Sequence, residues 1–168
     1  MLLESFSTPR LHARRLTAED LPEVHRFHQD PIAMAQLGGL RDLQQSEAYL
    51  ARNLAHWETY GFGLWLLRRH GVPEIVGRAC LRHLLIDDVD EVELGYGFYP
   101  ACWGQGLATE IALACVTNGF EHLDCSSLVA LTRPTNVASQ RVMAKAGLEF
   151  ERQVEHGGAP HVLFRRRR

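Results

Sequence analysis

The sequence predicts an α/β domain in which a mixed sheet carries helices on both of its faces. Segments with strand-like and helix-like patterns follow one another in the order β-α-α-β-β-β-α-β-α-β-β, which is typical of a layered α/β or α+β fold. The 168 residues contain no internal repeat, low-complexity tract or Pro/Ser-rich linker, so we expect residues 1–168 to form one domain. Their composition, 46% hydrophobic and 23% charged, is ordinary for a folded protein.

The first elements are identified from alternation, helix caps and helical spacing. Arg10–Leu16 alternates between apolar and polar residues as a strand does. Thr17 is a suitable helix N-cap, and apolar residues at helical spacing extend a first helix as far as Asp30-Pro31. Gly38-Gly39 breaks the chain, and an apolar stripe predicts a second helix over Ser46–Tyr60.

The remaining elements follow from the same signals, with Gly, Pro and Asp clusters marking the turns between them. We expect strands over Gly61–Arg69, Glu74–Arg82, Glu91–Tyr99, Ser127–Thr132, Leu148–Glu155 and His161–Arg165. We expect helices over Gly104–His122 and Asn136–Ala146. Loops or turns are predicted at His70–Pro73, Asp87–Asp90 and Gly157-Gly158.

Composition argues against several classes of partner. The net charge of −2 at pH 7 gives no general attraction for nucleic acid. No apolar run approaches the roughly 18–20 residues of a membrane span, and the N-terminus lacks the basic start and apolar stretch of a secretory signal. We therefore expect a cytoplasmic protein with no nucleic-acid or membrane partner.

Basic, histidine and cysteine residues add little to the assignment. The run Arg165–Arg168 could contact a polyanion or be a frayed, charged terminus. His25 and His28 lie three residues apart, but no third ligand is spaced to join them. The four cysteines form no Cys-x-x-Cys pair. We expect no bound metal.

The segment most informative about chemistry runs from Tyr99 to Glu110, where a strand ends, a glycine-rich turn follows and a helix begins. Gly104 and Gly106 allow a tight turn, and Ala108 is small enough for a ligand to approach the first helical turn. Unpaired N–H groups and the positive end of the helix dipole would bind a pyrophosphate there. The competing interpretation is a turn kept only for packing. The Gly-Lys-Ser/Thr ending of a nucleotide P-loop is missing.

A second strand-to-helix junction lies about thirty residues further along, at Arg133–Ser139. Pro134 keeps the entry to the helix extended. Asn136 is a favoured N-cap residue, or it could aim its side-chain amide at a linear ligand that emerges between two strands. Both interpretations stay open from sequence.

These residues resemble a known family. The motifs Trp103-Gly-Gln-Gly-Leu-Ala-Thr-Glu110, Val92-Glu-Leu-Gly-Tyr96 and Asn136-Val-Ala-Ser139 with Lys145-Ala-Gly-Leu148 are similar to those of the GNAT superfamily of N-acetyltransferases. More narrowly, they resemble its RimJ/RimL branch, which includes acetylators of ribosomal-protein N-termini. The similarity covers nearly the whole chain and includes Thr8-Pro-Arg-Leu11.

The resemblance implies a mostly antiparallel sheet that is splayed between its fourth and fifth strands and holds the pantetheine arm of acetyl-CoA in the gap. The pantetheine would pair with strand backbone, the pyrophosphate would lie on main-chain N–H groups, and an asparagine would bind a pantetheine amide. The acetyl-CoA-binding residues so implied are Phe98, Tyr99, Trp103, Gly104, Gln105, Gly106, Leu107, Ala108, Thr109 and Asn136.

The resemblance also implies catalytic residues. An amine must lose a proton before it attacks, and the departing thiolate must gain one. Glu93 matches the family's carboxylate base, although with Glu91 it could equally be a solvent-facing strand residue. Met143 stands where many relatives carry a tyrosine acid and cannot donate a proton. Ser139 could serve instead, or could merely assist the helix start.

The expected activity is transfer of an acetyl group from acetyl-CoA to a primary amine, by direct attack in a ternary complex. The acceptor could be a peptide or protein N-terminus or a small molecule. The alternative is a non-catalytic acyl-CoA sensor of the same fold. A homodimer is left open.

Overall fold

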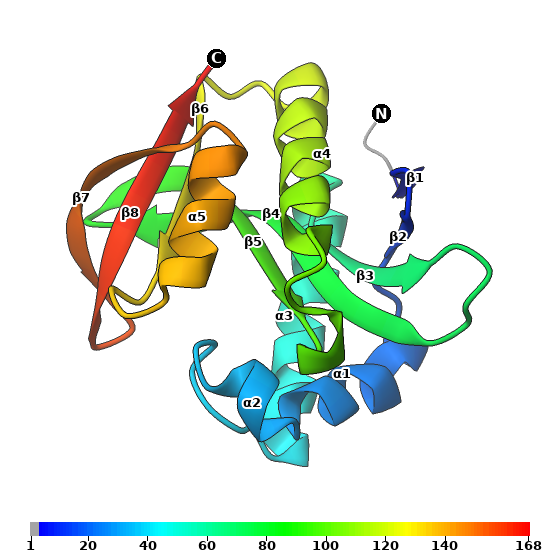
Figure 1. Ribbon diagram of the computed structural model, residues 1–168. Helices are drawn as coiled ribbons and strands as arrows, with labels where there is room; N and C mark the ends of the chain where they lie inside the picture. Colours follow the sequence, from blue (N-terminus) through cyan, green and yellow to red (C-terminus); the bar gives the residue numbers. More distant parts are fainter. Residues whose placement is uncertain (1–3) are drawn as a thin grey trace.

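The computed structural model describes residues 4–168, whose strands form one eight-stranded sheet in the order β1-β2-β3-β4-β5-β6-β8-β7 (Figure 1). The strands are β1 (Ser5–Ser7), β2 (Leu11–Arg15), β3 (Leu64–Arg69), β4 (Ile75–Ile86), β5 (Val89–Phe98), β6 (Ser127–Thr132), β7 (Glu149–His156) and β8 (Ala159–Arg167). The expected mixed α/β sheet is therefore confirmed.

The sheet opens between β5 and β6. Every other neighbouring pair of strands is antiparallel, whereas β5 and β6 run parallel and are in register at Glu93 and Val129 only. Beyond that position the two strands diverge (Figure 1). This gap, called the opening below, lies between the strands that the sequence places fourth and fifth, as the resemblance implies.

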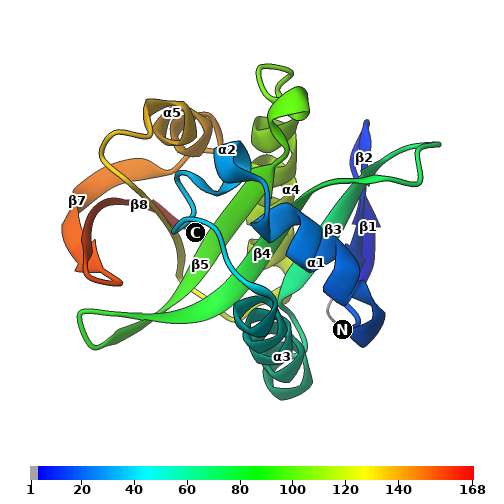
Figure 2. The ribbon, with the colours of Figure 1, turned by 90° about the horizontal axis from the view of Figure 1, so that it is seen from below.

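Helices cover both faces of the sheet, as expected. The helices α1 (Leu21–His28) and α3 (Leu43–Tyr60) lie on one face, and the short α2 (Pro31–Met34) follows α1. The other face carries α4 (Leu107–His122) and α5 (Val137–Lys145). In Figure 2 the sheet separates α1 and α3 from α4, and α2 lies toward α5. In residues 4–168, no helix is both long and apolar enough to cross a membrane.

Local chemistry fixes where the helices begin and end. Asp42 accepts a hydrogen bond from Gln45 N at 2.7 Å, while Gln45 Oε1 accepts one from Asp42 N at 2.9 Å. This capping box starts α3 at Leu43 rather than at the predicted Ser46. Gly61, at φ 73°, ends the helix in the left-handed conformation that glycine adopts without strain.

The hairpin of β4 and β5 is longer, and its turn shorter, than the sequence predicts. The aspartates taken for a loop form a two-residue turn, with φ 47° at Asp87 and 61° at Asp88. Positive φ at both central residues is the geometry that matches the twist of a two-residue hairpin, and aspartate tolerates it. The predicted strand therefore extends from Arg82 to Ile86.

Residues 165–167 of the terminal arginine run lie in β8, so the interpretation of a frayed terminus is wrong, whereas contact with a polyanion stays a prediction. Arg165 in β8 has a side chain only 12% exposed and lies 2.6 Å from carboxylate oxygens of Glu91 and Glu151. Arg168 donates to Leu123 O at 3.0 Å. The basic run thus fastens β8 to β5, β7 and the loop after α4.

One glycine is needed for the close pairing of β4 and β5. A Cβ atom added at Gly77 would lie 2.4 Å from the backbone oxygen of Gly97, which real structures essentially never show. We expect Gly77→Ala to lower the free energy of unfolding by about 1–3 kcal/mol, because the strands must move apart. Urea unfolding measures it, with exposed Ser5→Ala as the control expected within about 0.5 kcal/mol. An unchanged midpoint for Gly77→Ala would contradict the packing described.

Candidate active site

The opening exposes main-chain groups of β5. Tyr99 N donates to Val76 O at 3.0 Å, so the pair Gly77 and Phe98 is a non-hydrogen-bonded one in the antiparallel ladder. The N–H and C=O groups of Phe98, and of Tyr96 two residues earlier, therefore point away from β4 toward the opening. Phe98 O accepts from Trp103 Nε1 at 2.9 Å. The remaining groups have no backbone partner among residues 4–168 and could pair with an extended ligand.

A helix begins at the mouth of the opening without a capping side chain. Gly104 and Gly106 hold φ of 71° and 77°, and a Cβ atom on Gly104 would meet nothing within 4 Å. The first intrahelical bond of α4 runs from Glu110 N to Gly106 O at 3.0 Å. The N–H groups of the preceding residues, 107–109, thus have no helical acceptor, and no described side chain caps them.

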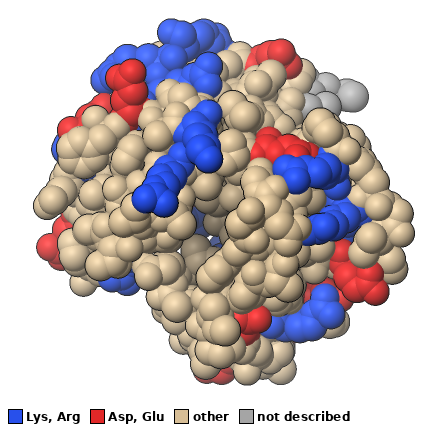
Figure 3. All heavy atoms as spheres, in the orientation of Figure 1, with Lys and Arg blue, Asp and Glu red and all other residues tan. Residues whose placement is uncertain are grey.

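Residues 104–109, called the cradle below, therefore present unpaired donors at the positive end of a 16-residue helix. This arrangement suits an anion such as a phosphate. Space is available for it: the surface is hollowed between α5, α2 and the turn that precedes α4 (Figure 3). The residues present thus fit a diphosphate group at the cradle.

The N-terminal segment braces the cradle, a role that the sequence analysis missed. Glu110 accepts from Thr8 Oγ1 at 2.5 Å, from Arg10 N at 2.9 Å and from Arg10 Nε at 2.6 Å. Arg10 Nη1 also donates to Gln105 O at 2.7 Å, and Arg69 donates to the Gln105 side chain. The signal was the Thr8-Pro-Arg-Leu11 motif, but only the fold brings it to residues 105–110.

The predicted acetyl-CoA-binding residues differ in whether their side chains or only their main-chain groups are accessible to a ligand. The side chains of Phe98 and Leu107 are buried in the core, 5% and 2% exposed, so only their main chains can contact a ligand. Trp103 is 52% exposed. Tyr99 has its N–H on Val76 and its C=O on Cys102 N, so Tyr96 rather than Tyr99 has its main chain directed to the opening.

The start of α5 flanks the opening on the same face as α4. Asn136 Oδ1 accepts from Ser139 N at 3.2 Å, which confirms Asn136 as the N-cap. Ser139 Oγ lies 2.9 Å from Tyr96 Oη, which also donates to Ser139 O at 3.1 Å. Burial raises the pKa of Tyr96 to about 12, so its phenol keeps its proton at neutral pH. Met143 is packed in the core, 2% exposed.

Glu93 lies on the opposite face of β5. Its residue is only 6% exposed, so the interpretation of a solvent-facing strand residue is wrong. Arg82 Nε on β4 donates to Glu93 Oε2 at 2.5 Å, and the nearby carboxylate raises the pKa of Arg82. Glu93 and Ser139 therefore approach the opening from opposite faces of the sheet and do not contact each other.

Within residues 4–168, no group of three or more His, Cys, Asp or Glu side chains is arranged to hold a metal ion. His28, one of the pair at helical spacing, is instead 1% exposed and bonded to Ser46 Oγ at 2.9 Å.

Residues 10–149 match the family model described as the acetyltransferase (GNAT) domain. The chain belongs to the GNAT acetyltransferase family. The Bacillus subtilis protein YkkB is 30% identical over 138 residues, which cover 82% of this chain and 80% of that protein. The FsC-acetyl coenzyme A-N(2)-transacetylase of Aspergillus fumigatus is 32% identical over 154 residues, covering 83% of this chain and 65% of the enzyme.

Solved structures share the GNAT fold. An acetyltransferase from Agrobacterium tumefaciens superposes with a TM-score of 0.86 at 26% identity, covering 100% of this chain and 96% of that one. RimL, a ribosomal L7/L12 α-N-protein acetyltransferase solved with coenzyme A, superposes with a TM-score of 0.80 at 17% identity, covering 98% of each chain. At that identity, the second likeness shows the fold alone.

These findings define the chemistry at a coarse level. The protein is an acyl-CoA-dependent N-acyltransferase of the GNAT type, and the family uses acetyl-CoA as its acyl donor. The main-chain groups of β5 at the opening and the N–H groups of residues 107–109 at the cradle are the groups that could bind such a donor.

The brace predicts a pH-dependent contribution to stability. Partial burial raises the pKa of Glu110, but hydrogen bonds from Thr8 and Arg10 outweigh it and lower the pKa below 4.5. A lowered carboxyl pKa stabilises the fold above the unfolded value, and the gain is lost as the pH falls through the folded-state pKa. We expect Glu110→Gln to be less stable at pH 7, with the difference narrowing below about pH 4.5.

Urea unfolding from pH 3 to 7 tests this, with Glu121→Gln, on the same helix and 62% exposed in its side chain, as the control. A Glu110→Gln difference that is constant with pH would contradict an ionic role for Glu110.

Proposed function

We propose that this enzyme transfers the acetyl group of acetyl-CoA to a primary amine by direct attack in a ternary complex. The observation that carries the proposal is the row of unpaired N–H groups at residues 107–109, placed at the mouth of the opening. The opening can be reached from both faces of the sheet. A thioester bound from one face and an amine bound from the other could therefore meet there.

In this proposal the cradle binds the pyrophosphate of acetyl-CoA. The pantetheine arm extends along the free main-chain groups of Tyr96 and Phe98. The side-chain oxygen of Asn136 caps α5, and its NH2 group is the part left to bind a pantetheine amide. The Arg10 guanidinium, 50% exposed beside the cradle, adds positive charge toward the phosphates.

Glu93 is the proposed general base. An amine is mostly protonated at neutral pH and must lose a proton to attack. Its carboxylate, positioned by the hydrogen bond from Arg82 Nε to Glu93 Oε2, would accept this proton, directly or through a water. Attack then breaks the carbon–sulfur bond, so the thiolate leaves and the new amide forms.

Ser139 is the proposed acid for that thiolate. Its hydroxyl lies on the α4–α5 face, and the protonated phenol of Tyr96 can replace the proton that Ser139 gives up. Solvent then returns a proton to Tyr96 and takes up the proton that Glu93 received from the amine. Tyr96 thus supplies, from β5, the phenol that Met143 cannot supply from α5.

The acceptor class is proposed at two levels. Similarity to the RimJ/RimL motifs, and to the fold of RimL, which acetylates a protein α-amine, favours a peptide-like amine. The A. fumigatus relative is named as an N(2)-transacetylase and shares more of the sequence, which keeps a small-molecule amine in view.

The cradle is tested by placing a negative charge on it. Glutamate is well tolerated in the first turn of a helix, because it interacts favourably with the dipole. We therefore expect Thr109→Glu to fold but to raise the calorimetric Kd for acetyl-CoA about tenfold or more, since its carboxylate repels the pyrophosphate. The neutral match, Thr109→Gln, is expected within about threefold of the parent. Equal affinities for the two variants would show that the phosphates lie elsewhere.

The base is tested by a matched pair of glutamates on β5. We expect Glu93→Gln to lower kcat about 100-fold with little change in the Kd for acetyl-CoA, as for loss of a general base. Glu91→Gln, two residues away and paired with Arg165 instead, should keep turnover within a few-fold of the parent. Steady-state kinetics across pH 6–9 provide the measurement. Full activity of Glu93→Gln would remove this residue from the mechanism.

A further inference from the structure

Two arginines on the α1–α3 face of the sheet lack a carboxylate partner. Arg41 precedes α3 and Arg78 lies on β4, and neither forms an ion pair with any aspartate or glutamate of residues 4–168. Arg82, on the same face of β4, is by contrast paired with Glu93. The two unmatched cations therefore leave this region positively charged.

A single aromatic ring holds both guanidiniums. The Cζ atoms of Arg41 and Arg78 each lie 5.0 Å from the ring centroid of Tyr49, within cation–π range. Arg78 also donates to Tyr49 Oη. Because both charges contact one ring, they are close enough to repel each other, and an anion between or beside them would relieve that repulsion.

The remaining contacts of these arginines are with neutral groups. Arg41 Nη1 donates to His28 Nε2 at 2.9 Å, and Arg41 Nη2 donates to Leu37 O at 3.3 Å. His28 is uncharged, because burial and then the charges of Arg78 and Arg41 lower its pKa to about 3. Burial and the neighbouring Arg78 also lower the pKa of Arg41. Most N–H groups of the two guanidiniums are left for a ligand.

The pair lies on the face of the sheet from which Glu93 reaches the opening. Along β4 and β5 the cross-strand pairs are Arg82 with Glu93, Cys80 with Gly95 and Arg78 with Gly97, and alternate residues share a face. Both positions between Glu93 and Phe98 on this face are glycines, so no β5 side chain separates the carboxylate from Arg78. At about 3.3 Å per residue, Arg78 is about 13 Å along β4 from Arg82.

The segment after α2 covers this region. A Cβ atom at Gly97 would lie 3.0 Å from Leu37 Cδ1, and Figure 2 shows α2 and the chain that follows it crossing β5. A small hollow beside Arg78 is lined by Phe27, His28 and Tyr49. Glu23 also lines this hollow, but its carboxylate is paired with Arg26.

We propose that Arg41 and Arg78 bind an anionic group, a carboxylate or a phosphate, carried by the acceptor amine. The inference rests on the proposed acetyl transfer and names the acceptor's class: a primary amine with an acidic group on the same molecule. Paired guanidiniums recognise such groups by charge-assisted, often bidentate hydrogen bonds. The amine would then lie toward Glu93 and the acid toward Tyr49.

Matched acceptors that differ only in the acidic group test this. The panel pairs amino acids with their carboxamides, dipeptides with their C-terminal amides, and phosphoethanolamine with ethanolamine. We expect the acidic member of at least one type of pair to have a kcat/KM about tenfold or more above its neutral match. The amino-acid and phosphoethanolamine arms distinguish a carboxylate from a phosphate.

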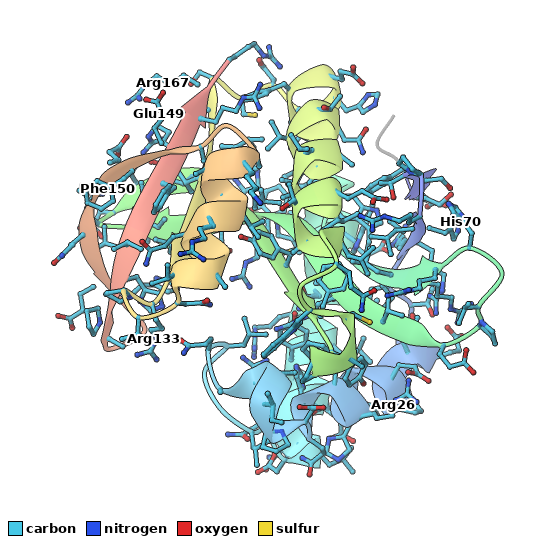
Figure 4. All side chains as sticks on the ribbon, viewed as in Figure 1. Arg26, His70, Arg133, Glu149, Phe150 and Arg167 are labelled. Atoms are coloured by element: carbon cyan, nitrogen blue, oxygen red, sulfur yellow. The ribbon has the colours of Figure 1, made fainter. Side chains whose placement is uncertain are left out.

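Variants then assign the preference to the two arginines. Arg78→Gln and Arg41→Gln should remove it through a rise in KM for the acidic acceptor, with the Kd for acetyl-CoA unchanged. Arg78→Lys, which keeps the charge, should retain part of it. The control is Arg167→Gln, at an arginine 74% exposed on β8 and far from α1 and α3 (Figure 4). A merely structural role would change Tm without changing the acidic-to-neutral ratio.

Calorimetric titration of the acidic amines into the enzyme saturated with coenzyme A gives a readout that does not need turnover. Acidic amines that bind the parent but not Arg78→Gln support the inference even if none is acetylated, in which case the proposed function fails separately. Equal use or binding of acidic and neutral amines, or a preference that survives both glutamine variants, would overturn it.

Discussion

The functional architecture depends on one break in backbone pairing. β5 and β6 are in register at Glu93 and Val129 and then separate, which leaves main-chain donors and acceptors of β5 without a strand partner. Buried backbone groups need a partner, and an extended ligand with amides of its own provides one. The opening is therefore the site that we propose for the acyl donor, and the helices, the turn and the charged side chains are arranged around it.

The two faces of the sheet divide the chemistry. On the α4–α5 side lie unpaired helix N–H groups, an N-cap amide and a serine–tyrosine pair, all of which suit a phosphorylated thioester. On the α1–α3 side lie a buried carboxylate and a surplus of guanidinium charge, which suit a charged acceptor. A reaction between the two substrates requires that they meet, and we propose that they meet at the opening, where β5 and β6 separate.

Local chemistry was readable from sequence, whereas long-range placement was not. Gly104 and Gly106 predict a tight turn and Asn136 predicts a helix cap, because each of these residues acts on its own neighbours in the sequence. Arg10 could not be assigned, because its partners Gln105 and Glu110 are about a hundred residues away. Likewise Tyr49 joins Arg41 and Arg78 only through packing. The start of α3 was readable after all, since Asp42-Leu-Gln-Gln45 is a capping-box pattern. The three-residue β1 is too short to show alternation.

The most direct measurement is a crystal structure of the enzyme with coenzyme A. We expect diphosphate oxygens within hydrogen-bonding distance, about 2.7–3.2 Å, of the main-chain nitrogens of residues 107–109, and a pantetheine arm beside Tyr96 and Phe98. A diphosphate bound elsewhere, with these amides facing solvent or protein side chains, would contradict this expectation.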